Sequence, residues 1–309
     1  SSSLNLKKSA ERLPGRKGKG KTCYFLPLSF REFVFLISPK AKEVEQNPLT
    51  SISTLTALFK QYVEASGFPQ IINDYFENKI DDSRYDIYKD WIEGEVTKAK
   101  RSPNYAYQVL SRVLESRSSQ LNWESIAQSS TIKSHTTIAD YIDLLDSLFI
   151  VKVVNQIENN LKIRPARNKK VYFFDHFLGS VVEKSVLKIN NYSEYYQQKI
   201  KESEYFSKVV ENIVFSNLLK HVVNKGYSLN DTIFFWRSKT QQEIDFMVYL
   251  RTGPKKLVTP IEVKYRNQAE RSNFKSFQPI ILSKDTYAPE KNILPVPLFL
   301  FKIEQYVKT

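Results

Sequence analysis

Two short runs in which polar and apolar residues alternate constrain the fold of this chain more than any other feature. They are Glu243-Ile-Asp-Phe246 and Ile261-Glu-Val-Lys264. Because successive side chains of a β-strand point to opposite faces, each run fits a strand with one polar face and one core-packed face. The interval between the runs suits a hairpin. We therefore expect a sheet that displays charged side chains on one surface.

If the two strands pair with their polar faces together, three carboxylates and one ammonium group converge. The four residues are Glu243, Asp245, Glu262 and Lys264. Carboxylate oxygens are the ligands that Mg²⁺ prefers in proteins, and the lysine can hold a water molecule or a scissile phosphate. The pattern therefore predicts a magnesium site on the sheet.

A further carboxylate, Glu211, lies in a predicted helix beside an apolar stripe of valine, leucine and phenylalanine. Burial of an unpaired carboxylate is costly, so Glu211 requires a cation or a raised pKa. We expect it to complete or support the metal shell of Glu243, Asp245 and Glu262. The alternative is a buried Glu211 to Lys264 ion pair without chemistry.

The formal net charge of +13 over 309 residues favours an anionic partner. The positive charge gathers in three clusters, at residues 7–21, 162–170 and 251–275. The last cluster surrounds the predicted carboxylate site, as binding of nucleic-acid phosphates requires. DNA is the partner that this pattern favours, and a generally basic surface is the alternative.

Composition excludes several kinds of site and indicates the cellular compartment. The single cysteine, Cys23, excludes an internal disulfide and agrees with a reducing, cytoplasmic environment, as does the lack of a signal pattern. No apolar run approaches the ~20 residues of a membrane-spanning helix, so we expect no membrane partner. The three histidines, His135, His176 and His221, are too scattered for a zinc site or a Ser-His-Asp site.

Helical periodicity dominates the first half of the chain. It predicts helices over residues 55–65, 85–97 and 105–115, and Ser29 followed by Glu32 predicts a capped helix start. Residues 122–154 fit a helix-turn-helix whose second helix starts after Ser134, with Phe149–Val154 as a wing strand.

The exposed face of that second helix does not suit base reading. It carries Thr136, Thr137, Asp140 and Asp143 instead of basic and amide side chains. Packing or protein contact is therefore favoured over insertion into the major groove.

From Lys170 the pattern changes to mixed α/β. Strands are predicted at residues 171–175, 232–237, 280–282 and 298–301, and a long helix over 205–223. Asp175-His176 should end a strand and cap the next helix.

Residues Gly15–Thr22 fit the Walker A pattern of a phosphate-binding loop letter for letter. Such a loop must follow a buried strand and open a helix. Here a basic segment precedes it and Cys23-Tyr-Phe-Leu-Pro27 follows. We therefore interpret the match as coincidental.

The motifs together resemble an archaeal or bacterial family of AAA+ ATPases that carries a winged helix and a C-terminal restriction-endonuclease-like domain of the PD-(D/E)xK type. The residues that carry the resemblance are Ser1–Ser3, Leu13–Arg16, Pro27–Phe33, Ser66–Pro69, Trp123–Phe149, Val210–Phe215, Glu243–Phe246 and Ile261–Tyr265. Relatives often have glycine before the Glu-x-Asp-Phe run, where this chain has Gln241 and Gln242.

The resemblance implies an α/β protein in three parts. These are the C-terminal remnant of an AAA+ module with its helical lid (residues 1–100), a winged-helix module (101–161) and an endonuclease-like domain (162–309). It implies that Ser2 and Ser3 border the γ-phosphate of ATP and that Arg16 acts as an arginine-finger-like group. The Walker A and B elements would lie upstream of Ser1.

The predicted function is that of a DNA-associated AAA+ ATPase whose C-terminal domain is a Mg²⁺-dependent nuclease. Glu211, Asp245, Glu262 and Lys264 would be the catalytic residues. The alternative is an ATP-driven switch or scaffold that binds nucleic acid or a partner without cleaving it. A homo-oligomer is a further expectation for either function. A buried ionic cluster without activity is the third reading.

Overall fold

The computed structural model describes residues 24–163, 168–252, 255–266, 274 and 276–307. Its contacts divide the chain into two compact units. Unit 1 contains residues 80–153 and 170–198 with the described residues 24–26, and unit 2 contains 27–79, 154–169 and 199–309. These units cut across the predicted sequential segments 1–100, 101–161 and 162–309. Arg16, Ser2, Ser3 and the Walker-like run lie outside the described residues.

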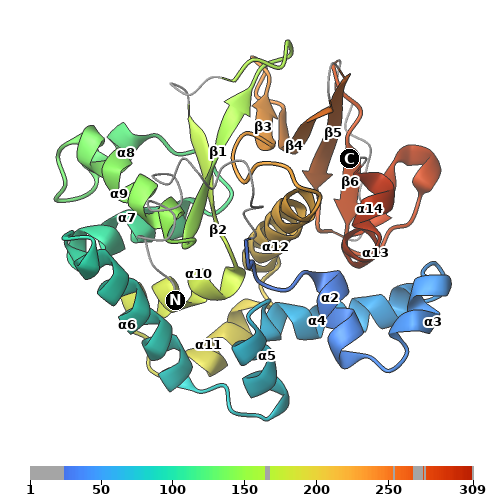
Figure 1. The fold of residues 1–309 in the computed structure, drawn as a ribbon, viewed down its shortest axis with the longest axis horizontal. Coiled ribbons are helices and arrows are strands. Elements are labelled where there is room, and N and C mark those ends of the chain that lie inside the picture. Colours follow the sequence, from blue (N-terminus) through green and yellow to red (C-terminus); the bar gives the residue numbers. More distant parts are fainter. Residues whose placement is uncertain (1–23, 164–167, 253–254, 267–273, 275, 308–309) are drawn as a thin grey trace, which may run out of the picture. The chain divides into compact units, whose positions relative to one another are not determined.

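Seven strands form one mixed sheet in the order β2-β1-β3-β4-β5-β6-β7, which confirms the predicted α/β class (Figure 1). The β1–β3, β5–β6 and β6–β7 pairs are parallel, and the β3–β4 and β4–β5 pairs are antiparallel. The strands are β1 (Val151–Ile157), β2 (Lys169–Phe173), β3 (Ile233–Arg237), β4 (Glu243–Thr252), β5 (Lys255–Val263), β6 (Ile280–Ser283) and β7 (Ile293–Pro295).

Unit 1 is mainly helical. Its helices are α6 (Asp82–Lys98), α7 (Pro103–Ser116), α8 (Trp123–Gln128), α9 (His135–Ser147), α10 (His176–Leu187) and α11 (Tyr192–Lys199). Two helices, α8 and α9, lie in the segment predicted as a helix-turn-helix, and Ser134 caps α9 as expected. The segment expected as a wing is β1, a member of the large sheet, whose Gln156 pairs with Phe235 of β3.

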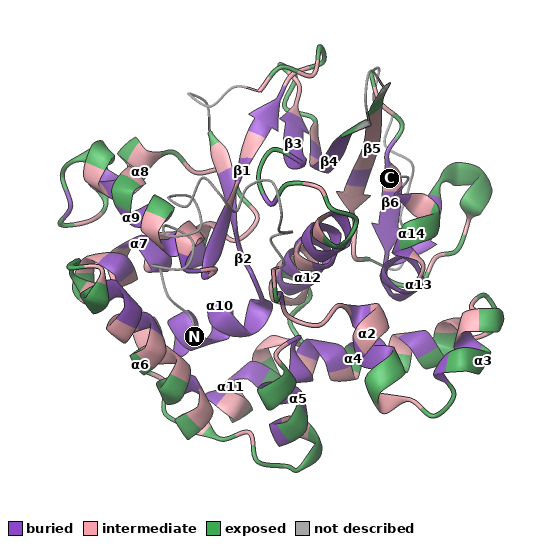
Figure 2. Cartoon of the chain, viewed as in Figure 1, coloured by how far each residue is buried: buried purple, intermediate pink, exposed green. Residues whose placement is uncertain are grey.

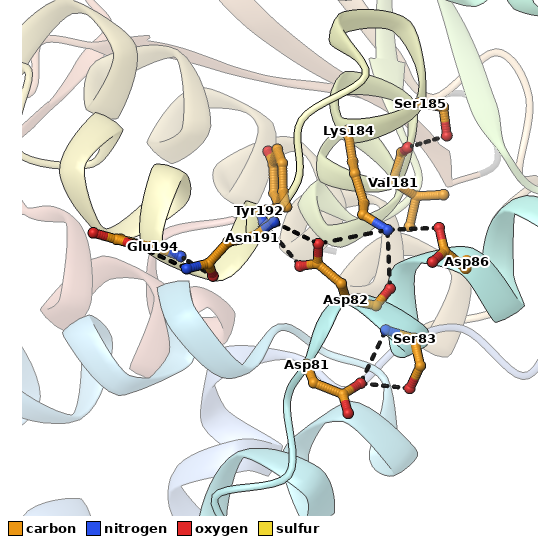
Figure 3. A network of polar contacts seen from close by, with 10 residues as sticks. All are labelled: Asp81, Asp82, Ser83, Asp86, Val181, Lys184, Ser185, Asn191, Tyr192 and Glu194. Carbon is orange, nitrogen blue, oxygen red and sulfur yellow. Dashed lines mark hydrogen bonds and ion pairs between the residues drawn. The ribbon is translucent and has the colours of Figure 1, made fainter.

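Lys184 of α10 is the centre of a polar network that links α6, α10 and the start of α11 in unit 1 (Figure 3). Its Nζ lies 2.6 Å from a carboxylate oxygen of Asp86 and donates to the main-chain carbonyl of Asp82 at 3.1 Å. The Asp82 carboxylate accepts the backbone N–H groups of Asn191 and Tyr192 at 2.7 and 2.8 Å. The first residues of α6 thus bind α10 and the start of α11.

Asp175 also behaves as predicted. It follows β2 and caps α10, where its side chain accepts the Phe177 N–H at 2.8 Å. This local hydrogen bond explains why Asp175-His176 ends the strand.

Unit 2 is built around α12 (Ser203–Asn224), which is buried along most of its length (Figure 2). The other helices of unit 2 are α2 (Phe30–Ile37), α3 (Ala41–Gln46), α4 (Ile52–Ala65), α5 (Pro69–Phe76), η2 (Pro289–Lys291), α13 (Val296–Phe301) and α14 (Ile303–Tyr306). The Phe215 ring of α12 contacts the Phe246 ring of β4 at a centroid distance of 6.2 Å. This contact places α12 against one face of the sheet.

One predicted strand is wrong. Residues 298–301 belong to α13, a helix in which every residue is buried. A short apolar run that is buried on all sides has no periodicity to separate strand from helix. Pro297 near the helix start favours the helix, because proline fits the first turn.

The Pro27-Leu-Ser-Phe-Arg-Glu-Phe33 motif forms a capped helix start, as Ser29 and Glu32 predicted. The Ser29 backbone N–H donates to the Glu32 carboxylate at 2.7 Å, and the Glu32 N–H donates to Ser29 Oγ at 3.3 Å. The two aromatic residues of the motif, Phe30 and Phe33, are completely buried. Capping therefore aims both rings into the core.

Two polar side chains of α12 hold this motif, and we call this set of contacts the α12 clamp. Asn217 Oδ1 accepts the Phe30 N–H at 2.7 Å. Lys220 Nζ lies 2.6 Å from Glu32 Oε2 and donates to the Pro27 carbonyl at 2.8 Å. Because Asn217 and Lys220 are buried, these contacts compensate for their loss of water.

We expect Lys220→Met to lower the free energy of unfolding of unit 2 by about 1–3 kcal/mol. This is less than the 3–5 kcal/mol typical of a fully buried pair, because the Glu32 side chain is 41% exposed. Trp236 is the only tryptophan in unit 2, so its fluorescence in a Trp91→Phe/Trp123→Phe background reports denaturation of that unit.

Lys208→Met is the matched control for this prediction. Lys208 also lies on α12 in an ion pair, but its partner Glu204 is exposed to solvent. It should therefore change stability far less than Lys220→Met. Equal effects of the two substitutions would contradict the role of the clamp.

The clamp also predicts a pH dependence. Burial raises the pKa of Glu32, but hydrogen bonds from Lys220 and Ser29 outweigh it, so the pKa lies below its ordinary value. A lowered folded pKa contributes stability above the unfolded pKa of about 4.3 and loses it as the pH falls through the folded pKa. The stability difference between wild type and Glu32→Gln should be constant near neutral pH and shrink below about pH 4. A stability difference that stays constant down to pH 3 would refute the lowered pKa of Glu32 as a source of stability.

Candidate functional site

The predicted site strands form an antiparallel hairpin. β4 and β5 pair from Phe246 opposite Ile261 to Thr252 opposite Lys255. The hairpin expected from the two alternating runs is therefore confirmed. On its other sides β4 pairs with β3, and β5 pairs with β6.

Asp245 lies at an irregularity of β4. Phe234 of β3 pairs with Met247, whereas Trp236 pairs with Ile244, so one residue of β3 faces two residues of β4. Such a β-bulge re-aims the side chains at it and is common beside active sites. The Asp245 carboxylate turns to β5, where Oδ2 accepts the Val263 N–H at 2.9 Å. This bond places it against the residue that follows Glu262.

Glu262 and Lys264 form an ion pair on β5 and its continuation. Their charged atoms, Oε1 and Nζ, lie 3.3 Å apart, and their side chains are 13% and 22% exposed. Residues two apart in an extended segment share a face, which accounts for the contact. A partly buried carboxylate beside an ammonium group thus lies next to the Val263 amide that binds Asp245.

Glu243 has a partner that the sequence did not reveal. It lies opposite Arg237 of β3 in the register, and Arg237 Nη1 is 4.0 Å from Glu243 Oε2. Cross-strand neighbours are invisible until the register is known. Arg237 therefore joins the charged groups of this region.

Glu211 lies on α12, one helical turn before Phe215, which packs on Phe246 of β4. Within the described residues, no group of three or more His, Cys, Asp or Glu side chains is placed to hold a metal ion. The predicted shell of Glu211, Glu243, Asp245 and Glu262 is therefore not assembled as one group. Mg²⁺ usually takes only one or two protein carboxylates with water, and Asp245 and Glu262 flank the paired residues Phe246 and Ile261 of the hairpin.

The turn before β4 is closed although it lacks the glycine of the resembled family. Gln241 takes up the left-handed conformation with φ of 66°, which glycine adopts most easily. The Ser238 N–H donates to the Gln242 carbonyl at 2.8 Å, and the Gln242 N–H donates to Ser238 Oγ at 2.9 Å. These bonds hold the turn with glutamine in the glycine position.

The predicted basic clusters are only partly described. Arg251, Lys256 and Arg266 of the third cluster are exposed. In the second cluster Lys162 is exposed, but Lys170 is 1% exposed and cannot contribute to a binding surface. The cluster at residues 7–21 lies outside the described residues.

Comparison with known proteins gives two partial matches. A family model described as a domain of unknown function (DUF4143) matches residues 206–297, and another described as a domain of unknown function (DUF8612) matches residues 56–193. DUF4143 is found in AAA-ATPase-associated proteins, which agrees with the broader part of the resemblance. The first match contains the whole candidate site. No curated protein and no solved structure matches the chain.

The helices are also informative about membranes. In the part of the chain that the structure describes, none is long and apolar enough to cross a bilayer.

We expect Asp245→Ala to lower the free energy of unfolding of unit 2 by about 1–3 kcal/mol, because the partly buried Val263 N–H loses its acceptor. Asp245→Asn can keep that bond through its amide oxygen and should cost much less. Denaturation followed by Trp236 fluorescence measures both. Equal losses would show that the hydrogen bond does not support the bulge, and Asn is accordingly the better substitution for activity tests.

Proposed function

We propose that unit 2 carries a Mg²⁺-dependent phosphodiesterase site that acts on DNA, in a protein that works with AAA+ ATPase machinery. The observation that carries the proposal is the hydrogen bond from the Val263 N–H of β5 to the Asp245 carboxylate of β4, next to Glu262, whose Oε1 lies 3.3 Å from Lys264 Nζ. Two acidic residues and a lysine at this spacing are suited to cleavage of a phosphodiester.

The residues have distinct roles in this proposal. Asp245 and Glu262 would hold the ion, and bound Mg²⁺ would polarise the phosphate and activate water. Lys264 would orient the attacking water and stabilise the negative charge that develops on the phosphate oxygens. Glu211, from the neighbouring helix, would support the water shell. Arg237 would hold Glu243 in place.

The proposed ATP chemistry rests on residues outside the described structure. Arg16 would act as an arginine-finger-like group, and Ser2 and Ser3 would border the γ-phosphate of ATP. The similarity to DUF4143 supports association with an AAA ATPase. A homo-oligomer would accord with such machinery.

A non-cleaving scaffold is the second candidate, and one observation favours it. Three carboxylates of the site already hold protein partners: Asp245 binds the Val263 N–H, Glu262 binds Lys264, and Glu243 faces Arg237. Such a cluster can stabilise the hairpin without a metal ion. In this reading the domain binds nucleic acid or a protein partner and does not cut it.

Incubation with plasmid and branched DNA in Mg²⁺ or Mn²⁺ distinguishes the two functions. We expect wild type to cleave. Asp245→Asn, which weakens a proposed metal ligand, and Lys264→Met, which removes a transition-state donor, should each lose about 10²-fold or more in rate. Glu290→Gln is the control, because Glu290 is exposed on η2, outside the candidate site.

Inactivity of wild type and variants alike would refute the phosphodiesterase. Retained DNA binding in that case would favour the scaffold. Loss of activity in Glu290→Gln as well would show that the effect is not specific to the site.

A further inference from the structure

The outer half of the β4–β5 hairpin is a two-stranded ribbon. We define the ribbon as residues 250–252 of β4 and 255–257 of β5. The β3–β4 register ends at Ile233 opposite Val248, and the β5–β6 register begins at Ile261 opposite Ile280. The rungs Leu250–Leu257, Arg251–Lys256 and Thr252–Lys255 therefore join β4 to β5 alone in the described register.

The ribbon carries an unfavourable charge arrangement. Arg251 lies directly opposite Lys256, and both residues are exposed. Like charges at directly opposed positions destabilise a sheet. The sequence from Tyr249 to Val258 contains no acidic residue that could offset the repulsion locally. A bound anion would offset it.

Arg251 is also held in a defined position. Its Nε donates to the Tyr249 hydroxyl at 2.9 Å, and its guanidinium carbon lies 5.4 Å from the centre of the Tyr249 ring. Tyr249 is 5% exposed and packs in the core cluster with Trp236 and Met247. A guanidinium fixed on a buried ring loses less conformational entropy when it binds a phosphate, for which its planar fork is suited.

We propose that this ribbon is an arm that binds the phosphate backbone of duplex DNA through Arg251 and Lys256. A two-stranded ribbon fits the major groove, which is about 12 Å wide. Arg251 is six residues from Asp245 along β4, a separation of about 20 Å at ~3.3 Å per residue. The arm and the candidate site therefore lie on the same hairpin. The assignment of duplex DNA rests on the proposed function, but its test does not require cleavage.

Binding of a labelled 30-base-pair duplex to the full chain in EDTA tests the arm. Arg251→Gln/Lys256→Gln should weaken binding about tenfold or more at low salt and reduce the slope of log K against log salt by about two, one per phosphate contact. Lys201→Gln/Lys291→Gln removes the same charge from exposed positions of unit 2. It should leave the slope nearly unchanged.

Two further measurements separate binding from folding. Lys256→Gln should not lower thermal stability, because it relieves the repulsion from Arg251. Tyr249→Phe keeps the ring and the net charge but loses the hydroxyl that positions Arg251, so binding should weaken by an intermediate amount. Arg251→Lys keeps the charge but lacks the planar guanidinium, so it should also bind more weakly than wild type. Wild-type affinity in Arg251→Lys would contradict a role for the positioned guanidinium.

Equal affinity and slope in wild type and Arg251→Gln/Lys256→Gln would overturn the proposal. So would equal losses in the two double variants, or binding of single-stranded DNA or heparin in preference to the duplex. If the wild-type chain binds the duplex without ever cleaving it, that result would refute the proposed phosphodiesterase. Loss of this binding in Arg251→Gln/Lys256→Gln would still support the arm.

Discussion

The ion pair between Lys220 and Glu32 is the constraint on which unit 2 depends. α12 is apolar on most sides and buried, so the polar groups that it carries need partners in the protein. The Pro27–Phe33 motif supplies them through the Glu32 carboxylate, the Pro27 carbonyl and the Phe30 N–H. In return the motif is fixed, with Phe30 and Phe33 in the core. A motif that first stands out as a sequence signature is thus explained by packing.

The same helix places the candidate site. Phe215 packs on Phe246, beside the bulge at Asp245, and Glu211 lies one turn earlier. The bulge turns the Asp245 carboxylate to the β5 backbone, so the end of the hairpin is held by a side chain. Both the phosphodiesterase and the scaffold are compatible with this arrangement, since the same contacts that would orient metal ligands also satisfy them.

Charge is distributed unequally along the β4–β5 hairpin. At the inner end each of three carboxylates has a partner, whereas at the outer end Arg251 and Lys256 oppose each other. A sheet selected for stability alone would separate or pair those cations. The unfavourable pair is therefore more readily explained by an anionic ligand than by folding.

Local chemistry let the sequence predict much of this structure. The Ser29 cap, the Asp175 cap, α9, α12 and the site strands all depend on residues close together in the chain. Their apolar residues repeat regularly over many positions, or a specific capping residue marks the helix start. Both signals can be recognised without knowing which distant segments pack nearby. The candidate residues Asp245, Glu262 and Lys264 followed from the same alternation.

The tertiary structure decided what depends on distant partners. It made residues 298–301 helical because they are buried on every side, and it made β1 a strand of the large sheet. It paired Glu243 with Arg237, buried Lys170 and put Gln241 in a glycine conformation. The sequence by itself determined which residues could form strands, helices and charged faces. Register, burial and the bulge at Asp245 decided which of those charges meet, because they arise only when segments far apart in the chain pack together.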